Sequence, residues 1–164
     1  MTAIGPQGNA GGAMAAALLA SYPEVFAAGA VCAALPVGAA NGLSEALRRM
    51  AEAGPARSPA GWADEVRRAG PIGYRGPWPR LSIWHGAADR VVDPENARLL
   101  AAQWATLHGM SLAATQTEQL GGIRHDQWLM RGEPIVELWD LDGLGHAWPT
   151  DATEPIARFW DIAA

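Results

Sequence analysis

The stretch Leu81–Val92, with the sequence LSIWHGAADRVV, contains the pattern on which the fold assignment rests. Its apolar first half predicts a buried strand, and the following loop carries an acid, Asp89. A second stretch, Trp139–Pro149 (WDLDGLGHAWP), has the same form, and its loop carries His146. Ligand sites in parallel sheets lie beyond the carboxyl ends of the strands. We therefore expect Asp89 and His146 to lie at one edge of a sheet.

The segments around these two stretches alternate between helical and extended patterns. An apolar helix is predicted over residues 11–21, and the continuous apolar run from Phe26 to Leu35 is typical of a buried parallel strand. Residues 37–79 are punctuated by Pro and Gly. We interpret them as an insertion between strands that forms one wall of a pocket. The alternation predicts an α/β fold with a parallel sheet and flanking helices in one domain, residues 1–164.

Local signals set the expected ends of several elements. Ser44 and Ser58 are predicted helix N-caps, the second followed by a proline in the first turn. Asp93 precedes a proline and predicts the start of a helix that ends near His108. The segments Leu112–Thr117 and Ile123–Met130, joined across two glycines, predict a hairpin.

Composition excludes several classes of function. The chain has 164 residues, 49% of them apolar and 18% charged, and a net charge of −5. An acidic chain without a basic run argues against nucleic acid as a partner. No window reaches the roughly 18 apolar residues of a membrane span, and the N-terminus lacks the pattern of a signal peptide. Cys32 is the single cysteine, and no histidine has metal-ligand spacing with a second His or Cys, so we expect neither disulfide nor metal.

The order of motifs resembles the α/β-hydrolase esterases of the polyhydroxybutyrate depolymerase group, which includes feruloyl-esterase-like members. The matching pieces are Ala10–Met14, Tyr22–Phe26, Ala27–Pro36, His85–Asp89 and Gly143–Pro149. The resemblance implies a partial α/β-hydrolase fold, namely the C-terminal portion of such a domain with its N-terminal strands missing. If those strands are missing, the strand at 26–35 should lack its usual neighbour.

The resemblance also implies roles for individual residues. Asp89 is the acid that orients the histidine, and His146 is the general base. Ala10 follows the nucleophile position and contributes its backbone N–H to the oxyanion hole. Trp148 lines the acyl pocket or packs in the core; the sequence leaves both open. Ester hydrolysis through an acyl-enzyme is implied, on a small or polymeric ester and without a cofactor.

Asn9 stands where the family carries its nucleophilic serine. Asn tolerates the left-handed backbone of such a turn, but a carboxamide is not a useful nucleophile. Three readings follow: an esterase-family chain with the serine replaced, a truncated or degenerate chain without turnover, and a module that binds a polyester or sugar ester. Family members are often secreted, but the sequence leaves the compartment open.

Overall fold

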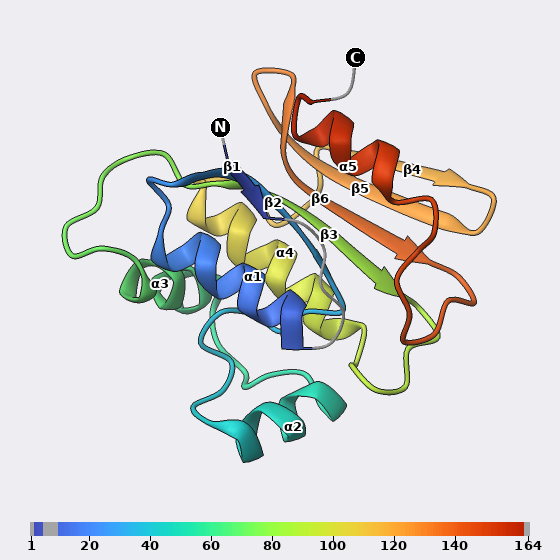
Figure 1. Ribbon diagram of the computed structural model, residues 1–164, viewed down its shortest axis with the longest axis horizontal. Coiled ribbons are helices and arrows are strands. Elements are labelled where there is room, and N and C mark those ends of the chain that lie inside the picture. The colour runs from blue at the N-terminus through green and yellow to red at the C-terminus, as the bar shows by residue number, and fades with distance from the viewer. Residues whose placement is uncertain (1, 5–9, 163–164) are drawn as a thin grey trace.

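The computed structural model describes residues 2–4 and 10–162. Within them, helices alternate with strands in the first two-thirds of the chain, and strands follow one another directly in the last third (Figure 1). The elements are β1 (Thr2–Ile4), α1 (Ala10–Ser21), β2 (Phe26–Cys32), α2 (Leu43–Ala51), α3 (Pro59–Ala69), β3 (Arg80–Gly86), α4 (Glu95–Leu107), β4 (Gln116–Leu120), β5 (Ile123–Met130), β6 (Glu133–Leu141) and α5 (Thr153–Phe159).

The described strands form a mixed sheet with the order β1-β2-β3-β6-β5-β4. The pairs β1–β2, β2–β3 and β3–β6 are parallel, which confirms the predicted α/β class. The pairs β6–β5 and β5–β4 are antiparallel, so the sheet is mixed. The predicted β4–β5 hairpin is confirmed, although β4 begins at Gln116 rather than Leu112. Gly121 and Gly122 both have positive φ, as the tightest hairpin turn requires.

Helices cover both faces of the sheet. Leu81 and Ile83 of β3 pack in a buried cluster with residues of α1, α3 and α4, whereas Trp84 packs in a second cluster with Ile156 of α5. Alternate residues of a strand point to opposite faces. The helices α1 and α4 therefore lie on one face and α5 on the other (Figure 1).

Three local expectations are corrected. The structure has a strand before the first helix, β1, and it pairs with β2, so β2 does not lack a neighbour there. The strand β2 ends at Cys32 because Ala33 has a φ of 48° and leaves the extended region. The N-cap of α2 is Gly42 rather than Ser44. In contrast, the cap of α3 is confirmed, since the hydroxyl of Ser58 accepts a hydrogen bond from the N–H of Gly61 at 3.1 Å.

Candidate active site

Asp89 and His146 meet at the carboxyl ends of two neighbouring parallel strands. Asp89 lies in the loop after β3 and His146 in the loop after β6, 57 residues later. Nδ1 of His146 lies 2.8 Å from Oδ2 of Asp89. The side chain of Asp89 is almost fully buried and that of His146 is 19% exposed. The structure thus brings these two predicted residues together; Asn9, predicted at the nucleophile position, lies outside the described residues.

The two carboxylate oxygens of Asp89 serve different partners. Oδ1 accepts hydrogen bonds from the backbone N–H groups of Val91 at 2.8 Å and Val92 at 3.0 Å, while Oδ2 faces His146. Burial is the largest influence on the pKa of Asp89 and raises it, but the hydrogen bonds from Val92, His146 and Val91 together hold the pKa below its ordinary value. Asp89 is therefore an anion at neutral pH, with one oxygen fixed by its own loop.

Gly86 allows the two loops to pack directly on one another. The N–H groups of Ala87 and Ala88 donate to the carbonyl oxygens of Leu141 and Leu144 at 2.9 and 3.0 Å. A Cβ at position 86 would lie 2.2 Å from the Leu144 oxygen. A side chain there is excluded by backbone atoms, so this position of the HGAAD stretch requires glycine.

The first helix reaches the same edge of the sheet. A Cβ at Gly12 of α1 would lie 2.4 Å from the carbonyl oxygen of Cys32, at the end of β2. The Cys32 thiol in turn lies 3.7 Å from the carbonyl oxygen of Ala147, beside His146. Burial, with a smaller effect of Asp89, raises the pKa of this thiol to about 11. The beginning of α1, where Ala10 lies, therefore stands near the loop of His146.

An apolar cavity of about 720 Å³ opens beside His146. Its walls come from α1, the end of β2, α2 and the loop after β3. The lining residues are Ala13, Met14, Ala17, Ala33, Leu35, Leu43, Ala46, Leu47, Met50, Val91, Val92 and His146. The cavity is of the size and character that hold small organic ligands.

The helix α2 supplies the part of this wall that is most exposed to solvent. None of its residues is buried, and Leu43 and Leu47 are 76% and 57% exposed. Sequence analysis predicted a pocket wall within residues 37–79 but named no residue of it. The signal was present, because Leu43, Ala46, Leu47 and Met50 recur at the spacing of one helical face. The assignment of residues 37–79 as an insertion stays a prediction.

Trp148 and the other histidines lie elsewhere. Trp148 is half-buried against the cluster beneath α5 and is not among the residues that line the cavity, so its substrate-binding role stays a prediction. Nε2 of His125 lies 3.0 Å from a buried carboxylate oxygen of Glu137, and Nε2 of His108 lies 3.2 Å from the carbonyl oxygen of Pro79. His85 is fully buried directly behind Asp89.

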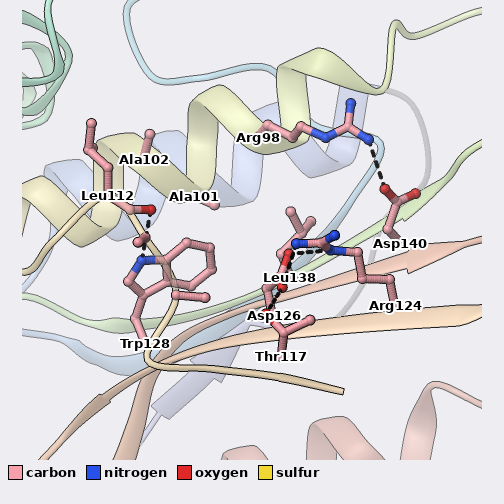
Figure 2. Close-up of a pocket in the computed structure, with 12 residues that line it drawn as sticks. Arg98, Ala101, Ala102, Leu112, Thr117, Arg124, Asp126, Trp128, Leu138 and Asp140 are labelled. Carbon is pink, nitrogen blue, oxygen red and sulfur yellow. Dashed lines mark hydrogen bonds and ion pairs between the residues drawn. The ribbon is translucent and has the colours of Figure 1, made fainter. Parts of the chain in front are cut away.

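A second pocket, of about 520 Å³, lies between α4 and the strands β5 and β6 (Figure 2). Its charged side chains are paired with one another: Arg98 with Asp140 at 2.9 Å, and Arg124 with Asp126 through two hydrogen bonds of 2.9 and 3.1 Å. The balanced pairs give this pocket no net charge of its own. Among the described residues there is no cluster of three metal-ligating side chains and no helix long and apolar enough to cross a membrane.

Comparison with known proteins identifies esterases as relatives. No protein-family model matches the chain. Poly(3-hydroxyalkanoate) depolymerase C of Paucimonas lemoignei is 35% identical over 144 residues, which is 87% of this chain and 34% of that protein. Acetylxylan esterase of Coprinopsis cinerea is 37% identical over 155 residues, 92% and 41% of the two chains. Feruloyl esterase B of Talaromyces stipitatus is 33% identical over 151 residues, 88% and 41% of the two chains.

Two solved structures share the fold. An acetyl xylan esterase from Aspergillus awamori superposes with a TM-score of 0.84 at 23% identity, covering 96% of this chain and 58% of that one. A PHB depolymerase in complex with an R3HB trimer gives a TM-score of 0.59 at 20% identity, covering 91% and 40%.

The curated relatives are carboxylic ester hydrolases, and an acetyl xylan esterase of known structure shares the fold of this chain. Within that class it belongs to the family of PHB depolymerases and feruloyl-esterase-like enzymes. The chain spans between 34% and 41% of the length of the three curated relatives described above.

Proposed function

We propose that Asp89 and His146 are the acid–base part of an ester-hydrolase site, and that the cavity beside His146 receives the apolar part of an ester. The observation that carries the proposal is the 2.8 Å contact between Nδ1 of His146 and Oδ2 of Asp89. A carboxylate on Nδ1 fixes the tautomer in which Nε2 accepts a proton, and it stabilises the imidazolium that results. Because Asp89 is buried and anionic, it suits this role.

The family's reaction would use these groups in two steps. A serine oxygen attacks the ester carbonyl while His146 takes its proton, and His146 then returns that proton to the leaving alcohol. Water hydrolyses the acyl-enzyme by the same route. Backbone N–H groups stabilise the oxyanion, and Ala10 supplies one of them on this proposal. No cofactor takes part in this scheme.

Asn9 interrupts this scheme at its first step. The lone pair of a carboxamide nitrogen is delocalised, so the nitrogen is a poor nucleophile. Removal of a proton by an imidazole does not give Asn9 the nucleophilicity of a serine alkoxide. We therefore propose that Asn9 occupies the nucleophile position without forming an acyl-enzyme. The apolar cavity and the Asp89–His146 pair support a second candidate function, the binding of a small or polymeric ester without turnover.

The test uses a short-chain p-nitrophenyl ester. We expect neither a burst nor an acyl-enzyme from the unchanged chain. Loss of one triad member leaves a hydrolysis rate at best roughly 10³–10⁴-fold above that of the uncatalysed reaction in water. Asn9→Ser, in a chain that also carries the N-terminal part of an acetylxylan esterase, should produce a burst that His146→Ala abolishes.

Two outcomes would contradict the proposal in different ways. Hydrolysis by the unchanged chain at a rate that His146→Ala does not alter would show that the acid–base assignment is wrong. Hydrolysis that His146→Ala destroys would instead show that the argument about Asn9 is wrong and that another nucleophile exists.

A further inference from the structure

His85 is buried and contacts the loop that carries Asp89. Its Nε2 lies 3.0 Å from the carbonyl oxygen of Val92 and 3.4 Å from Oδ2 of Asp89. A carbonyl oxygen only accepts hydrogen bonds, so Nε2 of His85 carries a hydrogen and donates it. The contact with Asp89 is close but is not a hydrogen bond, because that N–H is donated to Val92. Oδ2 of Asp89 thus lies near two imidazole rings, that of His146 in the cavity wall and that of His85 in the core.

The surroundings of His85 keep its ring in one form. Burial lowers the pKa of His85, against the opposing effects of the Val92 carbonyl and the carboxylates of Asp89 and Asp140. A neutral imidazole has one N–H, and in His85 that hydrogen is on Nε2. His85 is therefore a donor of a single hydrogen, which the carbonyl of Val92 accepts.

Asp140 is the neighbour of His85 on the adjacent strand. It is paired with His85 in the register of β3 and β6, and its Oδ2 accepts a hydrogen bond from Arg98, as Figure 2 shows. Nδ1 of His85 and Oδ1 of Asp140 are both buried without a hydrogen-bond partner in the described chain. The Arg98 guanidinium offsets the charge of Asp140. His85 thus has its one hydrogen bond to the backbone at Val92, on the side of Asp89.

We infer that His85 is a positioning residue for the Asp89–His146 pair: its Nε2–H fixes the backbone of Val92. The N–H of Val92 in turn holds Oδ1 of Asp89, so that Oδ2 faces Nδ1 of His146. Oδ1 of Asp89 accepts hydrogen bonds from the N–H groups of Val91 and Val92, so the orientation of the carboxylate depends on where the backbone of Val92 lies. Without His85, the Val92 carbonyl would lose the side-chain donor that holds it. The inference rests on the proposed function, in which Asp89 and His146 act as acid and base.

Histidine tautomers read by ¹⁵N NMR test this inference without any need for turnover. In the unchanged chain we expect His85 in the Nε2–H form and His146 in the Nδ1–H form, with a low-field Nδ1 proton. His85→Phe keeps a ring but removes the donor, and we expect it to make His146 a mixture of tautomers and to speed exchange of that proton at least several-fold. His85→Gln, which retains an N–H donor, should restore most of the Nδ1–H form.

His108→Phe is the matched control. His108 also contacts a backbone carbonyl, but that carbonyl belongs to Pro79 and not to the loop of Asp89. It should leave the His146 spectrum unchanged.

Each failure has its own signature. If Asp89→Asn does not alter the His146 spectrum, the assignment of Asp89 and His146 as an acid–base pair is wrong, and the proposed function fails with it. If Asp89→Asn removes the low-field proton but His85→Phe leaves it intact, the pair stands and the role of His85 is wrong. An Nδ1–H form of His85 in the unchanged chain also overturns the inference, even if the Phe variant does not fold.

Discussion

Gly86 lies so close to Leu144 that a Cβ on the glycine would be 2.2 Å from the leucine's carbonyl oxygen. The contact joins the loop that carries Asp89 to the loop that carries His146. It explains why the acid and the histidine can share a hydrogen bond although each belongs to a different loop. The stretch His85–Asp89 thus supplies the acid, Asp89, and also the space at Gly86 in which the loop of His146 packs.

Gly86→Ala should therefore separate the two loops. Backbone atoms cannot move aside as a flexible side chain would, so we expect the free energy of unfolding to fall by about 1–3 kcal/mol. The low-field proton of His146 should also disappear from the NMR spectrum.

The matched control for this variant is Gly145→Ala in the same loop as His146. A Cβ at position 145 has no atom within 4 Å, so this variant should change stability by less than about 0.5 kcal/mol. Equal effects of the two substitutions in chemical denaturation would contradict the role given to Gly86.

Asp89→Asn should change how stability depends on pH. The pKa of Asp89 is lowered in the folded state, below the value of about 4 in an unfolded chain. The stabilisation is therefore fully present above about pH 5 and is lost as the pH falls through the folded-state pKa. We expect the difference in unfolding free energy between the unchanged chain and Asp89→Asn to shrink steadily from about pH 5 toward pH 2 in urea titrations. Parallel curves over that range would show that Asp89 is not specially stabilised as an anion.

Much of the fold and half of the site were predictable because they depend on local patterns with fixed geometry. Apolar runs such as the one ending at His85 indicate buried parallel strands, and their carboxyl ends must share an edge of the sheet. That rule places Asp89 and His146 together before any coordinates are known. It does not say which oxygen of Asp89 each partner takes, because that depends on how the loop folds back on Val91 and Val92.

The features that could not be predicted from the sequence depend on contacts that form only in the folded chain. Residues Ile135–Asp140 have the apolar content of a parallel strand, yet β6 pairs antiparallel with β5 on its other side. Only the turn at Arg131 and Gly132, both with positive φ, shows that the chain reverses there. The short β1 carries too few residues for a periodic pattern. The contact of His85 with the Asp89 loop emerges only in three dimensions.

Leu47→Ser should weaken the binding of an apolar ester to the cavity beside His146. Leu47 lines the cavity from α2 and is 57% exposed, so its loss should not unfold the chain. Removing most of its apolar contact should cost about 1–1.5 kcal/mol, or roughly a tenfold increase in Kd for p-nitrophenyl butyrate. NMR titration at the His146 imidazole measures this. Arg48→Ser, next along the same helix and outside the cavity lining, controls for the helix propensity of serine; an equal loss of affinity there would rule out the cavity as the binding site.

Gln103→Leu should loosen residues 37–79 from the rest of the chain. Gln103 lies on α4 with no exposed surface, and its carboxamide makes three hydrogen bonds: with the N–H of Val37 at 2.9 Å, the carbonyl of Val37 at 2.9 Å and the carbonyl of Trp62 at 2.8 Å. Leucine matches its size but leaves those backbone groups buried and unsatisfied. We expect a loss of about 2–4 kcal/mol in unfolding free energy.

The position of the first proteolytic cleavage shows whether Gln103 holds residues 37–79 in place or stabilises the core as a whole. If Gln103 anchors residues 37–79, limited proteolysis of Gln103→Leu should cut first within that segment, before the Asp89 loop becomes accessible. Gln119→Leu, on the fully exposed strand β4, is the control and should be neutral within about 0.5 kcal/mol. Cleavage spread evenly over the chain would mean that Gln103 supports the whole core. Cleavage confined to 37–79, with the His146 spectrum intact, would show that this segment is held to the sheet by a few buried hydrogen bonds and can open without disturbing the acid–base pair.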